Sequence, residues 1–235
     1  MNRIVYILAD LFPQLGRYKR FVVAWIDHIK GEKESYSQFG EDQFIIGQIK
    51  ELSSEHGIYI DIGANHPTRI SNTYKLYRSG KRGITIEPNV ELINLHKRFR
   101  SEDTHLAVGC GEEDMVKEFY YSKTPVLSSF VRNEVFNQSH AEYLPVYTLD
   151  TIMSNVSSDS IDLISIDVEG WDLEVLKGSI KCLQRTSLVC VEANNKEYAE
   201  KIISFLSQYQ FELIKIIECN YIFKSQKLTY TNTST

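Results

Sequence analysis

The sequence contains few cysteines, and none of them has the spacing of a zinc site or of a disulfide framework. Its 235 residues include four cysteines, which lie far apart and form no Cys-x-x-Cys pair. This spacing argues against a zinc knuckle and against a small fold held together by disulfides. Cys190 stands in an apolar run and is expected to be a small buried hydrophobic residue. The cysteines therefore fit a reduced, cytoplasmic protein.

Long apolar runs are also missing. No stretch approaches the ~20 uninterrupted apolar residues that a membrane-spanning helix needs. The short apolar run near the N-terminus is interrupted by Asp10, and no small-residue cleavage site follows it. The sequence therefore predicts neither a membrane span nor a signal peptide.

The sequence also lacks an excess of positive charge. The formal net charge is -5, which gives no overall basic surface for nucleic acid. Only residues 1–36 are basic, with six Lys or Arg against four Asp or Glu. We therefore expect no nucleic-acid partner.

Residues 1–36 are predicted to form a helical arm of two short helices. Apolar residues recur at helical spacing in the first, and Pro13 is expected to bend or end it. The second has an apolar stripe through Phe21, Trp25 and Ile29. Such an arm would pack on the core or on a second subunit of a homo-oligomer. A basic amphipathic helix in peripheral contact with a membrane surface is the alternative.

Residues 37–226 are predicted to form one α/β domain, followed by a polar tail at 227–235. Strands that alternate with helices indicate a mostly parallel sheet with helices on both faces. The region 112–150 breaks this rhythm, and we expect an insertion there that shapes a substrate pocket. The expected sheet strands are Gly57–Ile62, Arg82–Glu87, Thr104–Val108, Ile161–Val168, Leu188–Glu192, Phe211–Ile217 and Tyr221–Lys224, the last two as an antiparallel hairpin.

Two carboxylates end neighbouring strands of this sheet. Asp61 stands two residues before Gly63 at the end of the first strand, and Glu87 ends the second. Open parallel sheets bind ligands at these ends, where a carboxylate can accept hydrogen bonds from both hydroxyls of a ribose. The Gly-x-Gly-x-x-Gly sequence that cradles a pyrophosphate is absent, which favours a cationic, phosphate-free nucleoside over NAD or FAD. Each carboxylate alone could also be a turn cap or a solvated strand end.

The runs YIDIGAN, IEPN and SIDVEGWDLEVLKG resemble the FkbM-type family of S-adenosylmethionine-dependent methyltransferases. The runs SQFGEDQFI and ANHPTRISNTYKLY look like a branch associated with bacterial surface-glycan gene sets. The resemblance covers residues 37–223. It implies a Rossmann-like class I methyltransferase fold of seven strands, of which the C-terminal one is antiparallel.

The resemblance also implies which residues hold S-adenosylmethionine. They are Glu87 at the ribose, Ala107 and Val108 beside the adenine, Asp61, Gly63 and Asn65 along the methionine part, and Gln38 and Glu41 closing over the donor. One position departs from the family pattern: many members have glycine where this chain has Pro67. The backbone is expected to be stiffer there.

Asp167, Glu192 and His66 are predicted to form the reacting end of the site. The two carboxylates end the fourth and fifth strands, His66 lies on the first loop, and Asp167 would also border the cofactor. Methyl transfer to an alcohol needs in-line geometry and removal of a proton, which a carboxylate can accept. Alternatively, the three side chains could ligate Mg or Mn, which would lower the pKa of the hydroxyl. His66 could equally be a hydrogen-bonded turn residue.

Five further residues are candidates for acceptor binding. Glu169 and Trp171 follow the fourth strand, where Trp171 would offer a flat surface for a sugar ring or ordinary helix packing. Ser128, Ser129 and Arg132 lie in the insertion and would suit a sugar, although a solvent-facing loop could carry the same residues.

Together these residues predict an O-methyltransferase that acts on a sugar hydroxyl, in a nucleotide-activated sugar or in a surface glycan such as capsule or lipopolysaccharide. A lipid or polyketide hydroxyl is an alternative acceptor, which a large apolar pocket would indicate. A non-catalytic partner module of a glycosyltransferase is a further alternative, against which the intact strand-end acidic residues argue. A nucleic-acid methyltransferase is disfavoured, because DVEG stands where such enzymes have an NPPY-type tetrapeptide.

Overall fold

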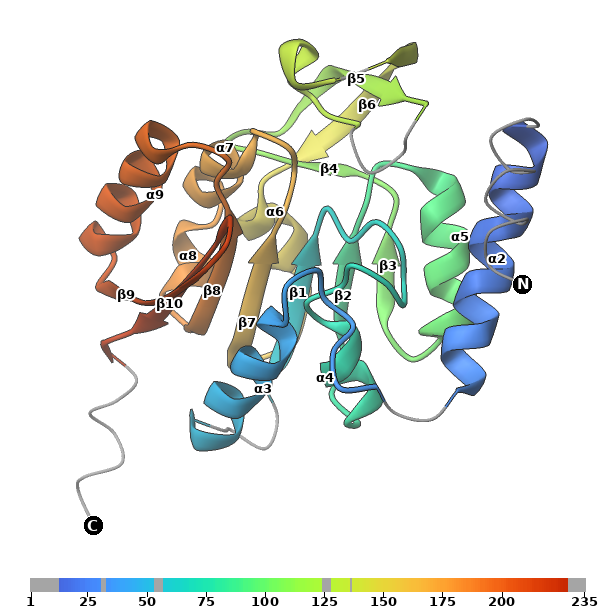
Figure 1. The fold of residues 1–235 in the computed structure, drawn as a ribbon. Coiled ribbons are helices and arrows are strands. Elements are labelled where there is room, and N and C mark those ends of the chain that lie inside the picture. Colours follow the sequence, from blue (N-terminus) through green and yellow to red (C-terminus); the bar gives the residue numbers. More distant parts are fainter. Residues whose placement is uncertain (1–12, 31–32, 53–56, 124–127, 136, 228–235) are drawn as a thin grey trace.

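The computed structural model describes residues 13–30, 33–52, 57–123, 128–135 and 137–227. Figure 1 shows one large sheet flanked by helices, with a smaller sheet above it. The first predicted helix of the arm and nearly all of the polar tail lie outside the described residues.

Seven strands form the main sheet, in the order β3-β2-β1-β7-β8-β10-β9. They are β1 (Ile58–Ile62), β2 (Gly83–Ile86), β3 (Thr104–Leu106), β7 (Ile161–Ile166), β8 (Thr186–Glu192), β9 (Phe211–Ile217) and β10 (Asn220–Ser225). β10 runs antiparallel to both of its neighbours, and the other neighbouring pairs are parallel. This topology confirms the predicted Rossmann-like methyltransferase fold with an antiparallel C-terminal strand.

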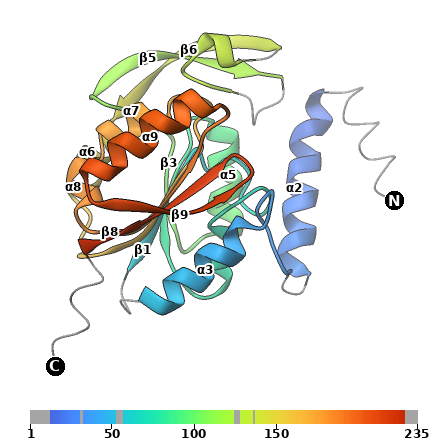
Figure 2. The ribbon, with the colours of Figure 1, turned by 60° about the vertical axis from the view of Figure 1, so that its left-hand side comes forward.

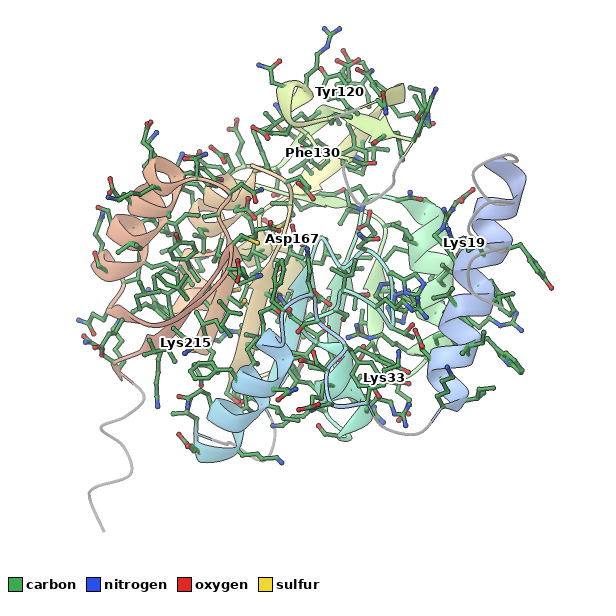
Figure 3. All side chains as sticks on the ribbon, in the orientation of Figure 1. Lys19, Lys33, Tyr120, Phe130, Asp167 and Lys215 are labelled. Carbon is green, nitrogen blue, oxygen red and sulfur yellow. The ribbon has the colours of Figure 1, made fainter. Side chains whose placement is uncertain are left out.

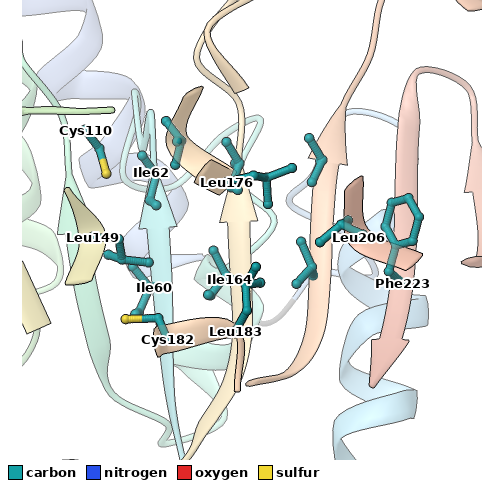
Figure 4. Close-up of a cluster of buried hydrophobic side chains, with 14 of the residues drawn as sticks. Ile60, Ile62, Cys110, Leu149, Ile164, Leu176, Cys182, Leu183, Leu206 and Phe223 are labelled. Carbon is teal, nitrogen blue, oxygen red and sulfur yellow. The ribbon is translucent and has the colours of Figure 1, made fainter. Parts of the chain in front are cut away.

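The central strands are short apolar runs because both faces of the sheet are buried. In β1, Ile60 points to one face and Tyr59 to the other, and each belongs to a different core cluster. The register aligns Ile60 with Ile84 of β2 and Ile164 of β7, and Figure 4 shows Ile60 and Ile164 in one layer. Each fully buried isoleucine stabilises the fold by about 1.5–3 kcal/mol.

Helices cover both faces, as predicted (Figures 1 and 2). The Tyr59 face carries α3 (Glu41–Leu52), α4 (Tyr74–Arg78) and α5 (Val90–Phe99). The Ile60 face carries α6 (Leu149–Met153), α7 (Asp172–Lys177), α8 (Ile180–Leu183) and α9 (Lys196–Gln208).

A further helix, α2 (Pro13–Ile29), packs on α5 beside the sheet, on the side away from α9 (Figures 1 and 2). Ala24 is buried in this contact, and the ring of Phe21 lies 5.6 Å from that of Phe99. Trp25, which was predicted to belong to the packed stripe, is 50% exposed. The helix is therefore held by a narrower face than its sequence pattern predicts.

Pro13 is the first residue of α2, whereas the helix that it was predicted to bend or end lies largely outside the described residues. Proline is tolerated there because the N–H groups of a first turn have no partner within the helix. Within the described ranges, no helix is long and apolar enough to cross a membrane.

The predicted insertion forms the smaller sheet, in the order β4-β6-β5. Its strands are β4 (Gly109–Cys110), β5 (Met115–Ser122) and β6 (Gln138–Tyr147), with a 3₁₀ turn, η2 (Arg132–Glu134), before β6. It lies over the carboxyl ends of the parallel strands (Figure 1). Phe119, Phe130 and Val146 form an apolar cluster within it.

Candidate active site

A cavity lies at the carboxyl ends of β1, β2 and β7, beneath the smaller sheet. It encloses about 540 Å³, part of which is open to solvent. Its walls come from three strand ends, from the segment after β3 and from the insertion. The lining residues are Ile62, Gly63, Asn65, Ile86, Glu87, Pro88, Val108, Cys110, Phe119, Ser128, Phe130, Asp167, Val168 and Glu169. Figure 3 shows Asp167 between the main sheet and the part of the insertion that carries Phe130.

Glu87 follows β2, and both of its carboxylate oxygens are fixed by the backbone. Oε2 accepts a hydrogen bond from the N–H of Asn65 at 3.1 Å, and Oε1 accepts one from the N–H of Asn89 at 2.8 Å. Burial raises the pKa of Glu87 to about 7, although the two N–H donors act in the opposite direction. A carboxylate can accept about four hydrogen bonds, so Glu87 can still accept the two ribose hydroxyls that the sequence predicts there.

The loop after β1 brings the backbone close to the end of β7. Gly63 has a φ of +77°, and a Cβ at this position would lie 1.8 Å from the carbonyl oxygen of Asp167. Only glycine fits such an approach. Asn65 follows in a left-handed conformation with a φ of 43°, and its carbonyl oxygen lies 3.0 Å from Nε2 of His96.

Asp61 does not line this cavity, in contrast to its predicted place along the cofactor. Its carboxylate accepts a hydrogen bond from the hydroxyl of Thr73 and lies 3.6 Å from Nη1 of the fully buried Arg100. Successive strand residues point to opposite faces, so Asp61 shares the helix-covered face of Tyr59. Burial raises the pKa of Asp61, and the charge of Arg100 opposes that rise.

Asp167 and Glu192, the predicted reacting pair, are brought together. Asp167 follows β7 and Glu192 ends β8, at neighbouring positions of these two paired strands. Burial, followed by the charge of Glu192, raises the pKa of Asp167 well above its usual range. Neighbouring carboxyl groups disfavour each other's ionisation. Oδ1 of Asp167 is buried and has no hydrogen-bond partner among the described residues.

The turn after β7 is built by Asp172. Its carboxylate accepts hydrogen bonds from the N–H of Val168 at 3.1 Å and from that of Gly170 at 3.2 Å. The turn holds Glu169 at a φ of 52°, so that its side chain lines the cavity. Burial and the charge of Glu192 raise the pKa of Glu169 to about 7, so this carboxyl is only partly ionised near neutral pH.

His66 lies apart from the carboxyl pair, in contrast to its predicted position. Its Nδ1 accepts a hydrogen bond from the N–H of Thr68 at 3.2 Å, and its Nε2 lies 3.2 Å from the carbonyl oxygen of Arg20. Both ring nitrogens are thus occupied by the loop and by α2. The three predicted ligands of Mg or Mn are therefore not assembled. Nor do other His, Cys, Asp or Glu side chains of the described residues gather in threes to hold a metal ion.

The residues assigned to the cofactor by resemblance fall into two groups. Gly63, Asn65, Glu87, Val108 and Asp167 line the cavity, whereas Asp61, Ala107, Gln38 and Glu41 do not. Ala107 and Gln38 are exposed, and the buried Glu41 accepts a hydrogen bond from the side-chain amide of Asn220 at 2.6 Å. Contact between this second group and the cofactor stays a prediction.

The three candidates in the insertion are separated in space. Ser128 lines the cavity, and its Oγ accepts a hydrogen bond from the N–H of Ser122 at 3.0 Å. Ser129 is buried and donates to the carbonyl oxygen of Glu169 at 2.9 Å, which ties the insertion to the turn after β7. Arg132 is exposed on η2 and does not line the cavity.

Trp171 packs against other side chains of the protein. Ordinary packing was one of the two roles that its position after the fourth strand allowed. Its ring lies 6.5 Å from that of Phe130, and Nζ of Lys117 lies 4.5 Å from its centre on one face. Its Nε1 is buried and has no hydrogen-bond partner in the described part of the chain. Stacking of a sugar ring on this indole stays a prediction.

The sequence pointed to Phe130 in the insertion but not to Phe119, and these two rings form the apolar roof of the cavity. The rings of Phe119 and Phe130 lie 4.8 Å apart and come from different segments of the insertion. Phe119 is buried, while its neighbours Glu118 and Tyr120 point to the other face of β5. That alternation is the signal by which Phe119 could have been recognised.

Residues 61–213 match the family model of the Methyltransferase FkbM domain. This segment contains all the residues that line the cavity. The chain belongs to the FkbM methyltransferase family. This FkbM-family protein is therefore a methyltransferase of the S-adenosylmethionine-dependent kind, while the surface-glycan branch stays a prediction.

Three solved structures that are similar to this chain are each distant from it in sequence. A TehB-like methyltransferase from Corynebacterium glutamicum is 12% identical, with a TM-score of 0.44, over 91% of this chain and 97% of that one. A human methyltransferase 10 domain containing protein is 10% identical, with a TM-score of 0.43, over 91% and 96%. An O-methyltransferase from Thermotoga maritima is 10% identical, with a TM-score of 0.41, over 81% and 67%. No curated protein matches the sequence.

Proposed function

We propose that this FkbM-family protein transfers the methyl group of S-adenosylmethionine to a sugar hydroxyl, in a nucleotide-activated sugar or a nascent surface glycan. The observation that carries the proposal is that Asp167 and Glu192 neighbour each other at the ends of β7 and β8, at the edge of a cavity that also contains Glu87. One end of this cavity suits a nucleoside donor. The other suits a hydroxyl that must lose a proton.

The residues of the cavity fit S-adenosylmethionine. Glu87 would accept the ribose hydroxyls, and Val108 with the ring of Phe119 would contact the adenine. The bare backbone at Gly63 leaves room beside the methionine part. The bound cofactor supplies an electrophilic methyl group on a positively charged sulfur, and the acidic wall favours that charge.

Asp167 is the group that we assign to the acceptor hydroxyl. Its Oδ1 has no partner among the residues that the structure describes, so an incoming O–H group could donate to it. A carboxyl group whose pKa is raised is a stronger proton acceptor once it is ionised, and Glu192 would relay or share the proton. This step requires no metal, because a carboxylate can itself take up the proton of the hydroxyl.

A sugar acceptor is favoured over a lipid or polyketide by the polarity of the open end. Glu169 and Ser128 stand there, and Glu134 is close enough to influence the charge of Glu169. The apolar roof of Phe119 and Phe130 lies within this same cavity, beside these polar side chains. We assign the reaction to the cytoplasm, where cysteines stay reduced, because all four cysteines are free.

The test is a turnover screen that follows the release of S-adenosylhomocysteine. Nucleotide sugars and short oligosaccharides form one set of acceptors, and long-chain alcohols form the other. Turnover with a member of the first set, lost in Asp167→Asn, would support the proposal. Turnover only with the long-chain alcohols would replace the sugar by a lipid acceptor. A protein that binds no S-adenosylhomocysteine would be a non-catalytic module.

A further inference from the structure

Helix α2 lies outside the segment that matches the family model, yet it contacts the loop that follows β1. The matched segment begins at residue 61, whereas α2 ends at Ile29. The loop between β1 and α4 carries Gly63 and Asn65, which line the cavity. Two side chains further along this loop, His66 and Arg69, bind α2.

The first connection is made by His66. Because Nδ1 accepts the N–H of Thr68, Nε2 carries the ring proton and donates it to the carbonyl oxygen of Arg20, 3.2 Å away. Burial lowers the pKa of His66 to about 4, so the ring stays neutral at physiological pH. The imidazole thus joins the loop to the backbone of α2.

The second connection is an ion pair. Asp27 of α2 is 1% exposed, and its carboxylate accepts a hydrogen bond from Nε of Arg69 at 2.5 Å. Nζ of Lys33 lies 2.6 Å from the same carboxylate. Burial would raise the pKa of Asp27, but the bonds and charges of Arg69 and Lys33 outweigh it and leave the pKa below its usual range. A charged pair at this depth fixes the position of the loop relative to the helix.

Helix α5 holds the end of the loop that faces the ligand. α5 donates from His96 to the carbonyl oxygen of Asn65, and its N-cap residue Asn89 donates to Glu87. α2 is fixed on α5 by the Phe21–Phe99 contact, so both helices form one support. Asn65 is thereby clamped between this support and the carboxylate of Glu87.

We propose that α2 is part of the cofactor-binding machinery, with His66, Asp27 and Arg69 as positioning residues that preorganise Asn65 and Glu87 for the ribose. The inference rests on the proposed function, because it concerns the donor half of the same site. Loss of the α2 contacts would let the loop leave its binding-competent conformation. If that conformation were populated one tenth of the time, the apparent Kd would rise about tenfold.

The experiment compares Asp27→Asn with Asp162→Asn. Asp162 is also a buried aspartate, 2.5 Å from Nζ of Lys81, but it lies near the start of β7, at the opposite end of the strand from the cavity. Both variants should lower the thermal midpoint. Only Asp27→Asn should weaken calorimetric binding of S-adenosylhomocysteine, by about tenfold. Adenosine should lose affinity by the same factor, because it contains the ribose that Glu87 and Asn65 face.

Arg69→Gln provides a second variant if Asp27→Asn does not fold. It should weaken the binding of S-adenosylhomocysteine as Asp27→Asn does. The double variant should bind this ligand no more weakly than the weaker-binding of the two single variants, because both substitutions remove the same ion pair. Unchanged affinity for S-adenosylhomocysteine in the folded variants would overturn this inference but not the proposed function. Equal losses of affinity in Asp27→Asn and Asp162→Asn would do the same. Absence of binding by the unmodified protein would overturn the proposed function as well.

Discussion

The two ends of the cavity hold their carboxyl groups in different ways. At the β1–β2 end, both oxygens of Glu87 accept backbone N–H groups within 3.1 Å. At the β7–β8 end, Asp167 neighbours Glu192, its pKa is raised, and its Oδ1 has no partner among the described residues. A carboxylate fixed by the backbone is preorganised to bind, whereas an unsatisfied one with a raised pKa is suited to react. We therefore expect the first end to control cofactor affinity and the second to control turnover.

The largest effect is expected from Asp167→Asn, which alters only the reacting end. An amide cannot take up the acceptor proton, so turnover of a sugar acceptor should fall about 10²–10⁴-fold. The calorimetric Kd for S-adenosylhomocysteine should stay within about threefold, a change of less than 1 kcal/mol. Asp159→Asn, at an exposed aspartate, is the control. Near-normal turnover in Asp167→Asn would remove this residue from the mechanism.

Glu87→Gln is expected to act on cofactor affinity, in contrast to Asp167→Asn, which acts on turnover. The substitution removes a charge and places amide hydrogens against the N–H of Asn65 or of Asn89. Hydrogen bonds to charged groups contribute about 1.5–3 kcal/mol, so the affinity for S-adenosylhomocysteine and for adenosine should fall roughly 10–100-fold. Glu102→Gln, at a side chain that is 61% exposed, should bind normally. An unchanged Kd in Glu87→Gln would show that the ribose does not lie at this carboxylate.

Gly63→Ala should disturb both ends at once, because Gly63 lies where β1 meets the carbonyl oxygen of Asp167. The added methyl group must displace backbone and also sits at a positive φ, which should cost about 1–3 kcal/mol in the free energy of unfolding. Gly47→Ala is the matched control, since a Cβ in that helix has no atom within 4 Å. It should gain up to about 1 kcal/mol. Equal stabilities of the two variants in urea unfolding would contradict the close approach.

The smallest effect concerns pH. Glu169 has a pKa of about 7 in the folded protein, above its ordinary value, so the native state holds more protons than the unfolded state between about pH 4.5 and 7. This group's contribution to stability is therefore lost as the pH rises through that window. His66 acts in the opposite sense below pH 6.5, so the comparison must be between variants.

Relative to the unmodified protein, Glu169→Gln should therefore become more stable as the pH rises from 5 to 8. Urea unfolding at the two pH values measures this difference. A difference that does not grow with pH would show that Glu169 is ordinarily ionised in the native protein.

Local patterns were sufficient to predict the framework of the fold. Apolar runs such as Ile161–Ile166 are long enough to be recognised as buried strands, and the polar residues that end them mark the edge where ligands bind. Glu87 and the pairing of Asp167 with Glu192 follow from this rule, because the carboxyl ends of parallel strands meet at one edge.

Contacts between distant segments could not be predicted in this way. Asp61 was assigned to the ligand because it precedes a glycine, but its carboxylate lies 3.6 Å from Arg100, a partner on another element that the sequence did not indicate. His66 was assigned to the carboxyl pair because it lies on the right loop, yet the carbonyl oxygen of Arg20 occupies it. Nothing within a short window of sequence indicates either partner.

The most direct test of the account is a calorimetric titration of S-adenosylhomocysteine into the unmodified protein, with and without EDTA. We expect saturable binding at a single site that EDTA leaves unchanged, because the residues that face the donor are Glu87, Asn65 and the backbone at Gly63. Absence of binding in both conditions would contradict the assignment of this cavity to the methyl donor.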